Sequence, residues 1–121
     1  MVDCHSVGWV ESSSECFLIT FYTTQQAKFQ GQWLIDWLLA AAARLDIQGA
    51  TVLQALRSVD HRGQMHSAHF FELSDQPVQV QFALSAAQAD SLLNYVNQQQ
   101  LSLFYVKAPV AFGYVGQGAA Q

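Results

Sequence analysis

The stretch PVQVQFALSAAQAD, residues 77–90, decides the fold because two hydrophobic periodicities meet within it. Its first half alternates apolar and polar side chains, which is typical of a strand that buries one face. Ser85 and Gln88 then have the spacing of a capping box, the usual start of a helix. The stretch therefore predicts a half-buried strand that passes directly into a helix.

The same periodicities predict the other elements. Strands are expected over 16–23, 50–59, 77–84 and 101–107, with helices over 32–47 and 86–99 and a short fifth strand over 109–115. The resulting order is β-α-β-β-α-β, in which each βαβ half makes a right-handed crossover. We therefore predict an α+β chain with a ferredoxin-like split sandwich, two helices covering one face of a four-stranded antiparallel sheet.

The first helix carries a second apolar stripe. Leu34 begins the stripe that faces the core, while Trp33 and Trp37 begin another. An amphipathic helix needs only one apolar stripe, so the tryptophans are expected to face another element or another subunit. Stacking on adenine is the alternative for these rings and for Phe70 and Phe71, but aromatic residues at helical spacing are more often core or interface residues.

The composition excludes some classes of partner. Charged residues make up only 12% of the chain, which leaves few charges to cover a monomer's surface and favours a homo-oligomer. The net charge is −4, and the five lysines and arginines are scattered. A nucleic-acid-binding protein usually has a basic stripe, so we expect no nucleic-acid partner.

The remaining bulk features favour a cytoplasmic protein that inserts in no membrane. No apolar run approaches the length of a membrane span, and the N-terminus lacks the features of a secretory signal. Cys4 and Cys16 are too few to indicate a disulfide framework. The expected organisation is an N-terminal arm over 1–15, one domain over 16–115 and a flexible tail over 116–121.

Three of the four histidines, His61, His66 and His69, lie in the connection before the strand at 77–84. Their H-x4-H-x2-H spacing is a poor metal signature, and an extended chain would point His66 and His69 to opposite faces. We therefore favour a loop or ligand-contact role and predict no metal. No nucleophile elbow of the GxSxG kind is present, so we expect no enzyme.

Phosphate binding would have to rely on side chains, because no Gly-rich phosphate loop follows a strand. Arg57 lies near the base of the connection, where its guanidinium could hold a phosphate through two hydrogen bonds. A solvated or ion-paired arginine is an equally good interpretation there. For Lys28, Arg62 and Lys107 the solvated interpretation is favoured.

A family resemblance rests on several short motifs. GATVL at 49–53, HSAHFFELS at 66–74 and Pro77 opening a strand resemble the DUF190 family, which belongs to the wider PII-like group of trimeric signalling proteins. Lys28 and Gly31 also fall where that family tends to carry a lysine and a glycine. The resemblance covers about residues 17–84 and, more loosely, the second half.

The resemblance implies a homotrimer that binds an adenine nucleotide (ADP, AMP or ATP) in clefts between subunits. It also implies that the loop over 59–77 orders on ligand binding and contacts a partner protein. The residues expected to bind the small-molecule ligand are Lys28, Arg57, Arg62, His66, Ser67 and His69.

Two alternatives stay open. The chain has Thr24-Gln25 and Gln54-Ala55 where the family usually has Gly-Glu and Arg-Gly, which favours a structural scaffold with a degenerate ligand site. A metal-binding or metal-responsive trimer, with His61 and His66 as ligands, is the other.

Overall fold

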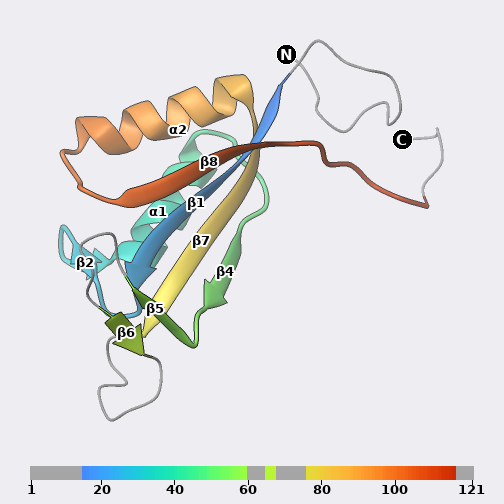
Figure 1. Cartoon of the computed structure of the whole chain (residues 1–121). Coiled ribbons are helices and arrows are strands. Elements are labelled where there is room, and N and C mark those ends of the chain that lie inside the picture. Colours follow the sequence, from blue (N-terminus) through green and yellow to red (C-terminus); the bar gives the residue numbers. More distant parts are fainter. Residues whose placement is uncertain (1–14, 60–64, 68–75, 117–121) are drawn as a thin grey trace.

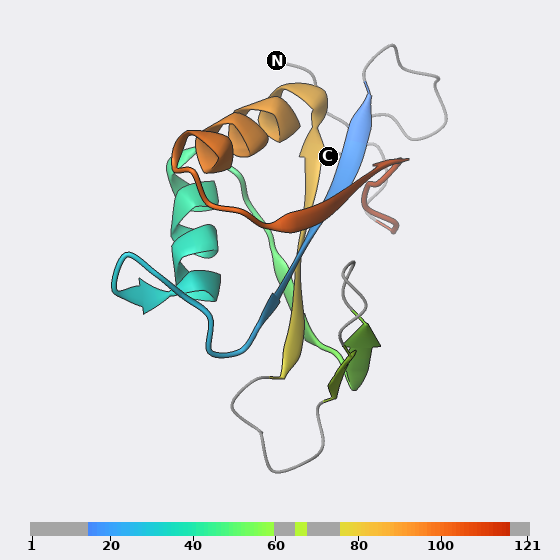
Figure 2. The same ribbon diagram turned by 60° about the vertical axis from the view of Figure 1, so that its left-hand side comes forward.

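The computed structural model describes residues 15–59, 65–67 and 76–116. In chain order the elements are β1 (Cys16–Thr24), β2 (Lys28–Phe29), β3 (Gln32–Trp33), α1 (Leu34–Arg44), β4 (Thr51–Gln54), β5 (Arg57–Val59), β6 (Met65–Ser67), β7 (Pro77–Ser85), α2 (Ala86–Gln98) and β8 (Phe104–Val110). Both helices lie on one face of the main sheet (Figures 1 and 2).

The main sheet has four strands in the order β4-β7-β1-β8, and every neighbouring pair is antiparallel. This is the strand order of the ferredoxin-like split sandwich, because each βαβ half leaves room for one strand of the other. The α+β, ferredoxin-like prediction is therefore confirmed. β1 lies in the interior of the sheet and pairs along its length with β7, from Cys16 opposite Ser85 to Thr24 opposite Pro77.

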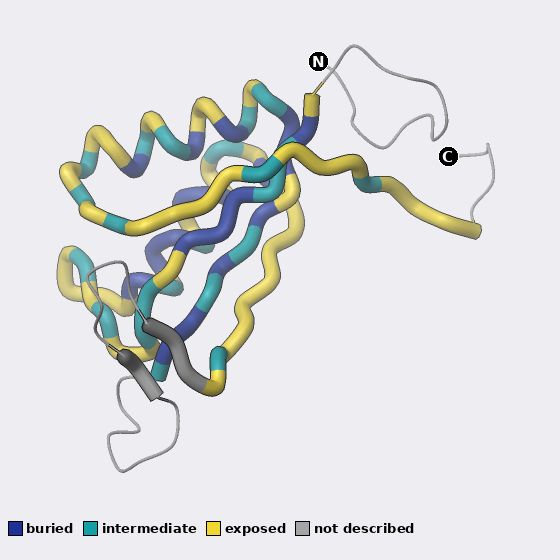
Figure 3. Tube along the Cα trace, in the orientation of Figure 1, coloured by how far each residue is buried: buried dark blue, intermediate teal, exposed yellow. Residues whose placement is uncertain are grey.

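The core lies between the sheet and the helices (Figure 3). The alternation predicted for β7 is confirmed, since its four core-facing side chains are at most 1% exposed: Val78, Val80, Phe82 and Leu84. Ile19 and Phe21 of β1 are equally buried and pack in the same cluster. Burial of such side chains contributes about 1.5–3 kcal/mol each to folding.

The helix α2 begins at the predicted capping box. The backbone N–H of Gln88 donates to Ser85 Oγ at 3.2 Å, and the backbone N–H of Ser85 donates to Gln88 Oε1 at 3.0 Å. These bonds satisfy N–H groups that the first turn would otherwise leave without partners. The strand-to-helix junction therefore needs no intervening loop.

The helix predicted over 32–47 is α1, Leu34–Arg44, and it starts later than predicted because the chain before it forms a hairpin. Strands β2 and β3 pair around Gln30 and Gly31, whose φ angles are +53° and +80°. Two successive residues with positive φ match the tight turn that joins two-residue hairpins. Trp37 is buried in the core, whereas Trp33 is 43% exposed.

Two strand predictions are corrected by the pairing pattern. The strand expected over 50–59 is divided in two, because β4 pairs with β7 as far as Gln54, whereas β5 follows a bend at Leu56 and pairs with β6. The two C-terminal strands expected over 101–107 and 109–115 are one strand, β8. Its pairing with β1 runs through Pro109, which an edge strand tolerates because it needs no N–H on its open side.

The sheet face away from the helices carries exposed apolar side chains. Cross-strand partners share a face, so Tyr22 lies beside Phe104, with ring centroids 5.6 Å apart, and Val106 lies beside Thr20. Leu53, Tyr22, Phe104 and Val106 are between 36% and 47% exposed. No helix covers this face in the described part of the chain, which agrees with the expected surplus of apolar surface.

The first residue of β1, Cys16, is disulfide-bonded. The chain's only other cysteine, Cys4, lies outside the described residues. The count of two cysteines indicated no disulfide framework, and it did not predict this disulfide. No described helix is both long and apolar enough to span a bilayer.

Candidate functional site

Two backbone hydrogen bonds hold together the ends of the connection between β4 and β7. The backbone N–H of Ala55 donates to the carbonyl of Pro77 at 2.8 Å, and that of Gln25 donates to the carbonyl of Gln76 at 2.8 Å. The two ends of the connection are therefore held together beside the end of β1. Residues just beyond this base belong to a loop, but the loop starts from a fixed position beside the main sheet.

Beyond the base, β5 and β6 pair as a small antiparallel sheet. Their register places Arg57 opposite Ser67 and Ser58 opposite His66. Three of the predicted ligand-binding residues, Arg57, His66 and Ser67, are thus brought together on neighbouring strands. Sequence periodicity missed this sheet, because three-residue strands are too short to show an alternation. The predicted residues Arg62 and His69 lie outside the described residues.

Lys28 lies on the β2–β3 hairpin, away from these strands. Its ammonium lies 4.7 Å from the centroid of the Trp33 ring. This cation–π contact places the charge near the N-terminal end of α1. Figure 2 shows this hairpin on the helix side of the sheet and β5–β6 on the other side. Within one chain, therefore, the structure does not bring Lys28 to Arg57.

The N-terminal end of α1, beside Lys28, combines the positive end of the helix dipole with one acidic side chain. Trp33 occupies the N-cap position without a side-chain hydrogen bond, and α1 presents its positive dipole end there. Asp36 in the first turn offsets part of that positive potential. The described residues at this end thus offer one flexible cationic side chain and helix amides to an anion.

Lys107 contrasts with Lys28. Its ammonium lies 4.3 Å from the centroid of the Phe17 ring, on the strand β8 within the main sheet. Both lysines make the same kind of contact, but only Lys28 stands at a helix start. This difference makes Lys107 a suitable matched control.

Among the described residues, no group of three or more His, Cys, Asp or Glu side chains is placed to hold a metal ion. His61 and His69 lie outside this part of the chain. The aromatic interpretation is confirmed for Trp37, which is a core residue. Phe70 and Phe71 lie outside the described residues.

Known structures define the class of fold. The chain is similar to the crystal structure of a protein from Thermus thermophilus described as a PII-like signaling protein, with 17% identity over 82% of this chain and 90% of that one and a TM-score of 0.60. It is also similar to CPII of Thiomonas intermedia, a nitrogen regulatory PII-like protein bound to ADP, AMP and bicarbonate. That match has 14% identity over 83% of this chain and 90% of CPII, with a TM-score of 0.62. The fold is therefore PII-like.

The family follows from the sequence match. The model of the family DUF190, described as an uncharacterized ACR, matches residues 16–105, which is most of the chain. This chain belongs to the DUF190 family, as the motifs at 49–53 and 66–74 indicated. No curated protein matches the chain significantly.

Proposed function

We propose that this chain is a regulatory protein, not an enzyme, that binds an adenine nucleotide between the subunits of a homotrimer. The observation that supports the proposal is the PII-like fold of a DUF190 member. In addition, the connection between β4 and β7 is held at its ends by backbone hydrogen bonds, and its strands pair Arg57 with Ser67. The related CPII structure holds ADP, AMP and bicarbonate. The ligand of this chain is accordingly ADP, AMP or ATP.

Assembly explains why the proposed ligand residues lie on two sides of one subunit. In a trimer, the Lys28 end of one subunit meets the β5–β6 end of the next, and a nucleotide between them contacts both. The exposed apolar side chains on the open sheet face, such as Phe104 and Val106, supply the surface for this assembly. A closed ring of three then buries that face in every subunit.

The proposed mechanism is a change of loop order. The nucleotide binds at the base of the 59–77 connection, where Arg57, Arg62, His66, Ser67 and His69 contact it. Binding fixes one conformation of the connection, and that conformation changes the affinity for a partner protein. The ligand can shift this equilibrium only by as much as its affinity differs between the two states.

A binding panel tests the proposal. Thermal unfolding and calorimetric titration with ADP, AMP and ATP, with bicarbonate, Zn²⁺ and Cu²⁺ as separate arms, should show stabilisation by at least one adenine nucleotide. Stabilisation by a metal alone supports the metal-responsive trimer. No stabilisation by any ligand supports a scaffold with a degenerate site.

Matched variants locate the site. Arg57→Ala and Lys28→Ala should each weaken nucleotide binding by about tenfold, which corresponds to about 1.4 kcal/mol. Lys107→Ala removes a lysine with a similar ring contact and should leave binding within about twofold of the parent. An equal loss in Lys28→Ala and Lys107→Ala would count against a site at the β2–β3 hairpin.

The proposal also includes the domain boundaries and the cellular location. Limited proteolysis should cleave within 1–15 and 116–121 and leave the domain over 16–115 intact. Cell fractionation should place the protein in the cytoplasm. The disulfide at Cys16 is the observation that weighs against this location, because disulfides are rare there.

A further inference from the structure

The disulfide at Cys16 lies on the open face of the main sheet. Side chains alternate along a strand, and Ile19 and Phe21 of β1 face the helices. Cys16 therefore points to the opposite side, as Tyr22 does, and it lies outside the buried cluster on the helix side. Its cross-strand partner on β8 is Val110, the last residue of that strand. The sulfur of Cys16 thus belongs to the apolar surface proposed to assemble the trimer.

The burial of Cys16 contrasts with that of apolar side chains beside it. Cys16 is 7% exposed, whereas Val110 directly opposite is 36% exposed and Val106 is 43% exposed. The one other cysteine of the chain is Cys4, so the disulfide is assigned to Cys4 and Cys16. A disulfide holds its two Cα atoms within roughly 4.4–6.8 Å of each other. The bond therefore attaches a second segment of chain to this end of the open face.

The disulfide closes a loop whose length matches the face. Residues 5–15 separate the two cysteines, and half of this segment, fully extended, reaches about 18 Å from the bond. The open face measures about 20 Å along β1 from Cys16 to Tyr22. The segment also carries Val7, Trp9 and Val10, apolar side chains of the kind that cover such a surface. The loop is therefore long enough and apolar enough to cover much of the face.

We propose that the disulfide between Cys4 and Cys16 is a redox switch for self-assembly. In the oxidised chain, residues 5–14 cover the open face at its Cys16 end and exclude a second subunit. Reduction releases this segment and exposes the face, so the homotrimer of the proposed function is the reduced form. The switch depends on that proposed function, because it controls the assembly proposed there. A regulatory disulfide is also the kind found in the cytoplasm, where structural disulfides are rare.

The switching reaction is a thiol–disulfide exchange with a dithiol reductant. One thiolate of the reductant attacks the sulfur of Cys4, because Cys16 is shielded, and Cys16 leaves as a thiolate that takes up a proton. The second thiolate of the reductant then attacks the mixed disulfide and releases Cys4, which is protonated in turn. Two electrons and two protons pass from the reductant to the chain, and the reductant becomes a disulfide. An oxidised dithiol reverses the exchange.

Light scattering coupled to size exclusion tests the switch on the full-length protein. The oxidised parent should have the mass of a monomer, and dithiothreitol should convert it to the trimer. Cys4→Ser should be trimeric with or without dithiothreitol, because Cys16 then has no partner within the chain. Ser6→Ala changes the same segment but keeps both cysteines, and it should behave as the parent. A parent that is trimeric in both redox states would overturn the switch and leave the trimer in place.

A second measurement separates the switch from the trimer. In Val106→Asp, which should be monomeric in both redox states, reduction should at least double the broadening of the Val110 methyl signals by a soluble paramagnetic agent. The methyl signals of Val78, which is buried on the helix side, should not change. Unchanged Val110 broadening would overturn the switch whatever the mass of the parent. A parent that is monomeric in both states, combined with increased Val110 broadening, would instead overturn only the trimer.

Discussion

The indole ring of Trp37 stacks on the ring of Tyr95, with centroids 5.8 Å apart and planes inclined by 16°. This contact joins α1 to α2 on the helix side of the sheet. Phe29 meets Trp37 edge-on at 4.9 Å, and Arg44 Nη1 donates to Tyr95 Oη at 2.8 Å. One tryptophan thus connects the hairpin and both helices.

Trp37→Ala should lower the free energy of unfolding by about 3–5 kcal/mol, the usual cost of removing a buried aromatic side chain. Trp33→Ala is the matched control, because Trp33 is 43% exposed and its loss should cost less than about 1 kcal/mol. Urea unfolding followed by circular dichroism measures both. Similar losses in the two variants would contradict a core role that is specific to Trp37.

Ser85→Ala should lower the free energy of unfolding by about 1 kcal/mol, because the first turn of α2 loses its cap. Ser91→Ala makes the same chemical change at an exposed position within α2 and should be neutral or slightly stabilising, since alanine is the better helix former. Chemical denaturation of the two variants gives the comparison. A neutral Ser85→Ala would mean that the capping box contributes nothing to stability.

The turn of the β2–β3 hairpin should respond to substitution with opposite signs at its two residues. Gly31 has φ +80°, so Gly31→Ala should cost about 1–2 kcal/mol. Nothing lies within 4 Å of an added Cβ there, so the cost comes from the backbone alone. Gln30 has φ +53°, and Gln30→Gly should relieve strain and raise the thermal midpoint. A stabilising Gly31→Ala would show that the turn differs in solution.

Val106→Asp should convert the proposed trimer into monomers, because it places a carboxylate on the open apolar face of the sheet. Light scattering coupled to size exclusion gives the mass. Ala87→Asp, at an exposed position in the first turn of α2, is the control and should leave the assembly unchanged. Leu53→Asp tests the same face from β4, and an unchanged mass in both variants would exclude this face as the interface.

The sequence alone determined the elements in which the pattern of apolar and polar residues extends over many positions. The alternation in β7 and the capping box at Ser85 are local features, and the structure places both as predicted. Two βαβ halves with short connections leave few alternatives to the split sandwich, because crossovers are right-handed. The family motifs at 49–53 and 66–74 likewise lie in continuous stretches of sequence.

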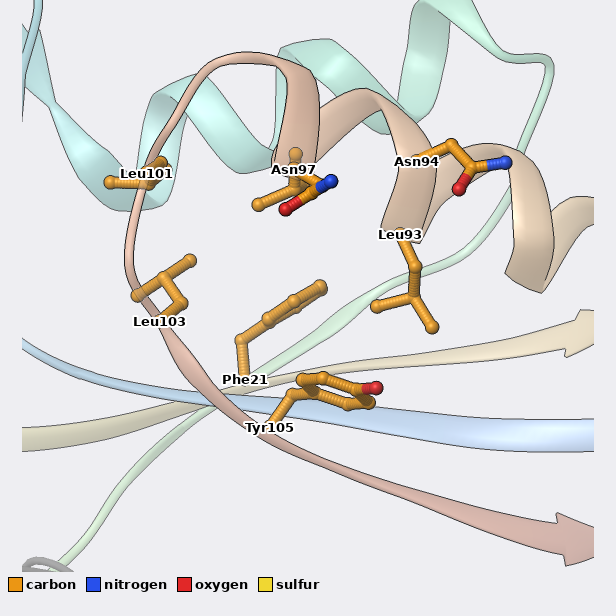
Figure 4. A pocket seen from close by; sticks show the side chains of 8 residues that line it. Phe21, Leu93, Asn94, Asn97, Leu101, Leu103 and Tyr105 are labelled. Carbon is orange, nitrogen blue, oxygen red and sulfur yellow. The ribbon is translucent and has the colours of Figure 1, made fainter.

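Only the tertiary structure decided which neighbours those elements have. The division of the 50–59 stretch into β4 and β5 depends on their separate pairing with β7 and β6, and the burial of Trp37 depends on Tyr95 from a distant helix. A surface hollow lined by Leu93 of α2 and Tyr105 of β8 likewise forms only where these two elements come together (Figure 4). Periodicity reports what one segment prefers, whereas pairing, burial and cavities arise from contacts between segments that are distant in the chain.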